Sequence, residues 1–153
     1  MTELTALDDA GAAAALRAAG AAARGFLDLD PVTQNDALLA RTLAGVEGRV
    51  FRAGDALVGA APNPRQPRQA LVACTSDEPA AVRALVGFLV TYRRTTSGLA
   101  LVPDGAPAVA AFRGAGFTEL GVLRDHGYGS GAYHDVRVLF GAGFGKAVAA
   151  WRP

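Results

Sequence analysis

A helix with one apolar face lies between two apolar runs of strand length, and this arrangement limits the folds open to the chain. The first run, residues 69–75, reads Gln-Ala-Leu-Val-Ala-Cys-Thr and carries no charge, which is typical of a strand buried inside a sheet. The second run follows at residues 97–102. Between them, Val82, Leu85 and Leu89 are spaced three and four residues apart, as one buried helix face requires. The unit predicts a mixed α/β (α+β) domain around one central sheet.

The other elements are predicted from apolar runs, capping residues, and proline or glycine clusters. Ser76 or Asp77 is the predicted cap of the central helix. In chain order, the remaining elements are a strand at 3–7, a helix over 8–24, a helix capped by Thr33, strands at 49–52 and 56–59, a loop at 62–67, a short helix over 107–114, and strands at 117–123 and 133–140 around a glycine-rich loop at 124–131. The predicted order is β-α-α-β-β-β-α-β-α-β-β, in one domain over residues 1–153.

Composition excludes several classes of protein. Of the 153 residues, 51% are hydrophobic and 19% are charged, which is incompatible with wholesale disorder. A net charge of +1 provides no broad basic surface, so neither nucleic acid nor a membrane is an expected partner. The single cysteine excludes an internal disulfide and zinc sites built from cysteine pairs. The start is acidic and no stretch reaches about 20 apolar residues, so we expect a cytoplasmic protein.

Residues 107–140 carry a family resemblance. A short helix ends in the pair Gly116-Phe117, which begins a strand, and a hairpin follows with Gly131-Ala-Tyr-His-Asp135 at its turn. This pattern, together with the order of elements, resembles the C-terminal third of GCN5-related N-acetyltransferases. The resemblance implies a GNAT-like mixed sheet in which two central strands, 71–74 and 97–102, splay apart and hold the pantetheine arm of acetyl-CoA.

The resemblance also implies a function and a set of site residues. The function is acyl-CoA-dependent N-acyl transfer, with acetyl-CoA as co-substrate and no metal, directly to a small-molecule or peptide amine. Tyr128 and Tyr133 lie in the hairpin that shapes acceptor access in that family, and they are the predicted catalytic residues. The predicted cofactor-binding residues are Leu71, Val72, Ala73, Cys74, Ser76, Ala80 and Ala81.

Two departures from the family pattern keep a second function open. The family's pyrophosphate loop reads Q/R-x-x-G-x-G/A, where glycines let backbone N–H groups approach the phosphates. Residues 74–83 contain no glycine here, Pro79 has no N–H, and Asp77 and Glu78 add negative charge at the helix start. Phe112 stands where a tyrosine often protonates the leaving thiolate. The alternative is a catalytically degenerate binding or regulatory module, or a different reaction in the same cleft.

The two histidines and the cysteine are candidates for metal binding or nucleophilic catalysis, but a structural role explains each of them more simply. His126 and His134, with the aspartates beside them, match a two-histidine, carboxylate metal site, but the polarity of a hairpin accounts for them more simply. Cys74 has no histidine near it in sequence, and a buried small apolar role is favoured over that of a nucleophile.

The tail, residues 141–153, has Phe144, Val148 and Trp151 at helical spacing. These side chains suit packing on this chain or on the sheet edge of a second copy, so a homodimer stays an open alternative.

Overall fold

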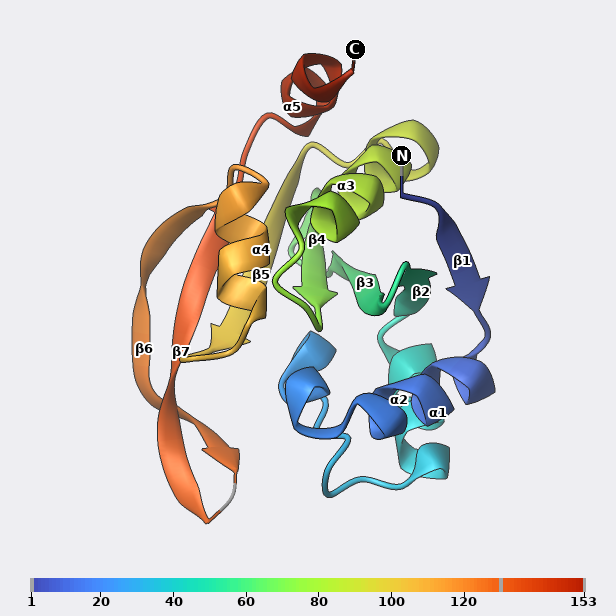
Figure 1. Cartoon of the computed structure of the whole chain (residues 1–153), viewed down its shortest axis with the longest axis vertical. Coiled ribbons are helices and arrows are strands. Elements are labelled where there is room, and N and C mark those ends of the chain that lie inside the picture. Colours follow the sequence, from blue (N-terminus) through green and yellow to red (C-terminus); the bar gives the residue numbers. More distant parts are fainter. Residues whose placement is uncertain (1, 130, 153) are drawn as a thin grey trace.

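Strands from all parts of the chain form one seven-stranded sheet (Figure 1). The computed structural model describes residues 2–129 and 131–152. The strands are β1 (Leu4–Leu7), β2 (Arg49–Ala53), β3 (Ala56–Asn63), β4 (Gln66–Cys74), β5 (Ser97–Pro103), β6 (Thr118–Gly129) and β7 (Ala132–Gly141). Their order across the sheet is β1-β2-β3-β4-β5-β7-β6. β4 and β5 pair in parallel, and the other neighbouring strands pair in antiparallel fashion.

Helices connect the strands in the predicted order. They are α1 (Asp9–Ala19), α2 (Asp36–Gly45), α3 (Pro79–Arg93), α4 (Ala108–Gly114) and α5 (Phe144–Trp151), with 3-10 turns η1 (Gly20–Ala23) and η2 (Phe26–Asp28). The expected mixed α/β fold with the order β-α-α-β-β-β-α-β-α-β-β is confirmed, and α5 adds a helix after the last strand. None of the helices in the described part of the chain is both long and apolar enough to span a membrane.

The two faces of the sheet bury separate apolar cores. Neighbouring strand residues point to opposite faces, so Phe51 and Val58 pack with the helices after β4, whereas Val50 and Leu57 pack with α1, α2 and η2. The α3 face contributes Leu85, which is fully buried, as its helical spacing predicted. The sheet is therefore a central layer with helices on both sides.

The first helix is shorter than the predicted 8–24. Asp8 caps α1 as expected, and its Oδ1 accepts a hydrogen bond from the Gly11 N–H at 2.7 Å. The helix ends at Ala19 because Gly20 takes a φ of +61° and its N–H bonds back to the carbonyls of Leu16 and Arg17. The chain then continues as η1.

Two predicted helix caps are wrong. The cap of α2 is Asn35 and not Thr33, because the Asn35 Oδ1 accepts from the Leu38 N–H at 2.9 Å. Glu78 occupies the cap position of α3, and no side chain caps that helix. The Ser76 hydroxyl instead accepts from the Glu78 N–H at 3.2 Å, within the connection that precedes the helix.

Two predicted loops are largely strand. β3 and β4 extend into the predicted 62–67 loop, and the pairing shifts between Pro62 and Asn63, so Pro67 lies in an irregular part of the ladder where no N–H is needed. β6 continues through the predicted 124–131 loop as far as Gly129. Its pairing is interrupted between Leu123 and Gly127, and Ser130 lies outside the described residues.

The tail forms α5 and packs on its own chain. Phe144 and Val148 are buried in the core that includes α3, and the Arg83 guanidinium lies 5.8 Å from the centre of the Trp151 ring.

The parallel pairing of β4 and β5 is short. Three residue pairs form it, and the last is Leu71 with Leu99. Beyond that point, residues 72–74 of β4 pair with β3, and residues 100–103 of β5 pair with β7. The ends of β4 and β5 point apart in Figure 1, so the two central strands splay as expected.

Candidate functional site

A cavity of about 750 Å³ opens on one side of the sheet where β4 and β5 separate. Its apolar surface comes from Leu71 of β4 and from Leu99 and Leu101 of β5, and Val72 of β4, whose side chain is buried on the other face of the sheet, also borders it. Leu101 is 42% exposed, although it lies on a central strand. Such exposure of apolar side chains at a concave surface is typical of a ligand site.

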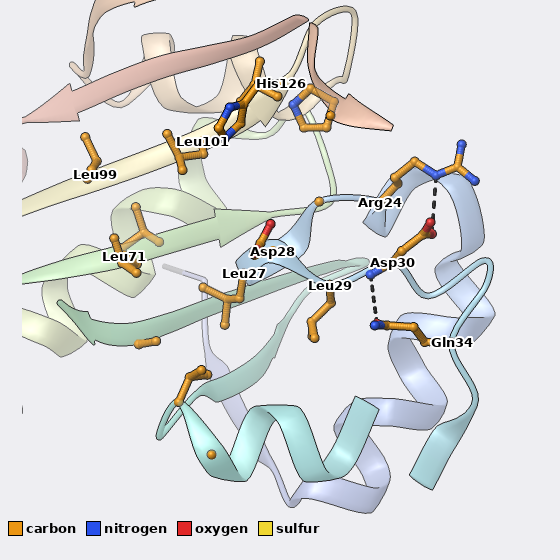
Figure 2. Close-up of a pocket in the computed structure, with 18 of the residues that line it drawn as sticks. Arg24, Leu27, Asp28, Leu29, Asp30, Gln34, Leu71, Leu99, Leu101 and His126 are labelled. Carbon is orange, nitrogen blue, oxygen red and sulfur yellow. Dashed lines mark hydrogen bonds and ion pairs between the residues drawn. The ribbon is translucent and has the colours of Figure 1, made fainter. Parts of the chain in front are cut away.

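The turn around η2 forms one wall of the cavity (Figure 2). Phe26 and Leu29 are buried on either side of the turn and hold it against the sheet. The Phe26 ring lies so close to Gly59 of β3 that a Cβ there would be 2.6 Å from it. A Cβ on Gly25 would lie 2.9 Å from Pro103 at the end of β5. The turn is therefore held against β3 and against the end of β5.

Two residues at the tip of this turn have left-handed backbone conformations. Leu27 has φ +47° and Asp28 has φ +65°, values that side chains other than glycine rarely adopt. The turn is closed by the Gly25 N–H, which donates to the Leu29 carbonyl at 2.7 Å. Both tip residues line the cavity.

The β6–β7 hairpin forms the opposite wall. His126, Gly127 and Tyr128 of β6 and His134 of β7 line the cavity. Tyr128 pairs across the hairpin with Tyr133, and their rings meet edge to face with centres 5.1 Å apart. The structure thus brings the two predicted tyrosines together, at 63% and 68% exposure, and places Tyr128 in the cavity lining.

Charged side chains near the cavity are mostly acidic. Asp28, Asp30 and Glu47 line it, whereas Arg24 is its one lining arginine or lysine among the described residues. The Arg24 guanidinium is 3.4 Å from the Asp30 carboxylate, and the Arg24 side chain also lies over Gly129 at the hairpin tip. Arg24 therefore joins the two walls.

The predicted cofactor-binding residues lie along β4 and at the start of α3. Leu71 and Val72 line the cavity, but the side chains of Val72, Ala73, Cys74 and Ala81 are all buried, and Val72 belongs to the α3-side core. Ser76 is half-buried in the connection, and Ala80 is exposed in the first turn of α3. Cys74 is buried as predicted, and burial raises the pKa of its thiol.

The start of α3 matches a phosphate site poorly. The Glu78 N–H is already bonded to the Ser76 hydroxyl, and the Ala81 N–H is bonded to the Glu78 carbonyl. Pro79 has no N–H, and its ring packs on Gly114 of α4. The apolar splay fits a pantetheine arm, but these two bonded N–H groups, the proline and the acidic Asp77 and Glu78 make the helix start a poor partner for a diphosphate.

Phe112 is fully buried, and its ring lies 5.0 Å from that of Phe117. It packs in the α3-side core and does not line the cavity. Within residues 2–129 and 131–152, no group of three or more His, Cys, Asp or Glu side chains is arranged to hold a metal ion.

Asp28, Glu47 and Arg24 line the cavity although nothing in the sequence marks them as site residues. No local pattern marks them, because the segment around Asp28 reads only as a chain break before Pro31. His126 and His134 were attributed to hairpin polarity, and the structure adds that both line the cavity. Positive φ at Leu27 and Asp28 has no sequence signature, since neither residue type predicts it.

Comparisons with known proteins agree on the fold. The structure is similar to two mutant forms of the spermidine N-acetyltransferase SpeG from Vibrio cholerae. One is a mutant of the "spermidine/spermine N-acetyltransferase", with TM-score 0.69, 16% identity, and coverage of 99% of this chain and 100% of that one. The other has TM-score 0.71, 17% identity, and coverage of 99% and 98%.

A third structure has a different acceptor in its name. RimL, a ribosomal L7/L12 α-N-protein acetyltransferase in complex with coenzyme A, matches with TM-score 0.64, 17% identity, and coverage of 92% and 93%. No protein-family model and no curated protein sequence matches the chain. The chain has the GCN5-related N-acetyltransferase fold, and at this level of identity the similarity establishes the fold alone.

Proposed function

We propose that the chain is an N-acyltransferase that moves an acyl group, an acetyl group above all, from an acyl-CoA to a small-molecule or peptide amine. One observation supports this proposal above the others. The pairing of β4 with β5 ends at Leu71 and Leu99, and the cavity opens at that point. Coenzyme A in the RimL complex and the polyamine named for SpeG are consistent with it.

The donor's pantetheine arm is proposed to lie in the splay, on the predicted cofactor-binding residues. Leu71 supplies apolar surface, and Val72, whose side chain is buried in the α3-side core, contributes backbone atoms. Ala73, Cys74 and Ala81 contribute through backbone atoms because their side chains are buried, and Ser76 and Ala80 border the helix start. An acyl thioester supplies an activated carbonyl, and the chain's contribution is to position it beside the acceptor.

The acceptor is proposed to occupy the cavity between the η2 turn and the hairpin. An amine attacks only after it loses the proton that it carries at neutral pH. Imidazoles take up protons near neutral pH, so His126 and His134 are the proposed proton acceptors on the hairpin wall. Tyr128 is proposed to contact the acceptor, and Tyr133 to hold the Tyr128 ring in place.

A second function is supported by specific features. The acidic start of α3, with Asp77 and Glu78, and the buried ring of Phe112 favour a binding or regulatory module that keeps the cleft without transfer. Both functions use the same cavity. They differ in whether an acyl-CoA donor reacts there, and the site for the second ligand is common to both.

Calorimetric titration with acetyl-CoA, free CoA and pantetheine tests the proposal, followed by a screen of amines for turnover. Leu99→Trp fills the splay and is expected to abolish acetyl-CoA binding, whereas Leu120→Trp, at an exposed position of β6 outside the cavity, is the matched control. Saturable binding with turnover supports the transferase. Binding without turnover of any amine favours the module, and so does the absence of acetyl-CoA binding, which contradicts the transferase.

A further inference from the structure

Of the three carboxylates that line the cavity, Asp28 and Glu47 have no side-chain partner among the described residues, and Asp28 lies exposed at the tip of the η2 turn. Asp28 forms no ion pair or side-chain hydrogen bond with any residue of the described chain, whereas Asp30 is paired with Arg24. Figure 2 shows the Asp28 carboxylate pointing away from the turn, toward the side of the strands that carry Leu71 and Leu101.

The backbone that presents Asp28 is strained. Leu27 and Asp28 both have positive φ, which glycine would adopt at little cost and which these residues resist. Backbone strain of this kind persists only where the surrounding packing holds the chain in that conformation, and it is found most often at functional sites. Here the buried Phe26 and Leu29, and the close contact of Gly25 with Pro103, impose it.

The charge of the cavity defines what Asp28 can bind. Three carboxylates and one guanidinium line it, so its formal charge is −2 when both histidines are neutral. The same cavity is lined by the apolar side chains of Leu71, Leu99 and Leu101. A carboxylate beside an apolar surface suits a ligand with an ammonium group on an apolar chain.

We propose that Asp28 binds the ammonium group of the acceptor, and that the acceptor is a protonated primary amine on an apolar chain. This inference rests on the proposed function. Asp28 is a positioning and specificity residue: it receives the amine in its charged form, and the proton that must leave before attack passes to the hairpin imidazoles or to water.

Binding of n-hexylamine and its neutral analogue n-hexanol, measured by calorimetry without a donor, tests the role of Asp28. The wild-type chain is expected to bind hexylamine at least about tenfold more tightly than hexanol, the effect of one charge-assisted hydrogen bond. Asp28→Asn keeps the size of the side chain and tolerates positive φ, so the preference is expected to disappear while the fold remains. Asp55→Asn, an exposed neutralisation in the β2–β3 turn, is expected to keep it.

Asp28→Gly separates function from stability. Glycine relieves the positive φ, so Tm is expected to rise by about 1–4 °C while the preference for hexylamine is lost. A fall in Tm with the preference retained would assign Asp28 a structural role and overturn the inference. The inference is also overturned if Glu47→Gln, and not Asp28→Asn, removes the preference.

A separate measurement keeps failure of the inference distinct from failure of the proposed function. Asp28→Asn is expected to bind acetyl-CoA as the wild-type chain does, because the splay residues are unchanged. Absence of acetyl-CoA binding in the wild-type chain contradicts the proposed function. Equal binding of hexylamine and hexanol by the wild-type chain contradicts the inference alone.

Discussion

The imidazole of His134 lies across the backbone of Gly127, its cross-strand partner in the β6–β7 hairpin, in the space that a Cβ atom would need. Gly127 is thus required for space and not for an unusual backbone conformation. Both residues line the cavity, so the missing side chain on β6 decides where an imidazole of β7 sits.

Gly127→Ala is expected to displace the His134 ring from the cavity wall and to lower acceptor turnover. The methyl group would overlap the ring, which must rotate away. Histidine ¹H–¹⁵N spectra and initial rates with an amine acceptor measure the two effects. Gly121→Ala is the control on the same strand, because nothing lies within 4 Å of its added Cβ. Unchanged spectra in Gly127→Ala would contradict the contact.

Arg137 joins three elements through an ion-pair network near the same hairpin. Its guanidinium lies 2.7 Å from Glu119 of β6 and 2.7 Å from Asp104 after β5, and Arg137 holds the pKa of Glu119 below its usual range. A lowered carboxyl pKa stabilises the fold at pH values above the ordinary glutamate pKa, and this stability is lost as pH falls through the folded-state pKa.

Arg137→Gln is therefore expected to unfold at lower urea concentration than the wild-type chain at pH 7, with the difference shrinking toward acid pH. Urea unfolding at several pH values between about 3 and 7, the range over which carboxyl groups titrate, measures this difference. Arg52→Gln, at an exposed arginine of β2, is the control and is expected to show a difference that does not depend on pH. If the loss of stability in Arg137→Gln is the same at every pH, the ion-pair network is not its cause.

Phe112→Tyr tests whether a hydroxyl at this position restores a proton donor. Phe112 is fully buried, so the added hydroxyl enters an apolar core and is expected to lower the free energy of unfolding by about 1–3 kcal/mol. We expect no gain in transfer rate. Phe140→Tyr, at a half-buried position of β7, is the control for adding a hydroxyl. A faster variant at Phe112 would show that the ring reaches the reacting atoms.

Neutralising the start of α3 is expected to tighten CoA binding. The double variant Asp77→Asn, Glu78→Gln removes two negative charges near the helix N-terminus, and each such charge is worth about 0.3–1 kcal/mol at low salt. Calorimetry should show about 3- to 30-fold tighter binding of CoA at low salt. Pantetheine, which carries no phosphate, is the control ligand, and an equal gain for both would place the diphosphate elsewhere.

Much of the fold follows from local patterns. The apolar run in β4 and the three- and four-residue spacing of Val82, Leu85 and Leu89 in α3 each depend on a few neighbouring residues, and the structure confirms them. The errors occur where other contacts overrule a local signal. Asn35 replaces Thr33 as a cap because the chain turns once more before α2, and the glycine-rich segment after Leu123 is strand because β7 pairs with it.

The sequence by itself determined the order of the elements and the absence of glycine at the start of α3, because periodicity and residue type are local properties. The splay of the two central strands was an expectation from the family resemblance. Only the tertiary structure decided which polar side chains meet at the splay. Asp28 reaches the cavity because Phe26 packs over Gly59, on a strand about 30 residues away, and His134 reaches it through the register of the hairpin. Such contacts between distant segments have no local pattern, so they depend on how the whole core packs.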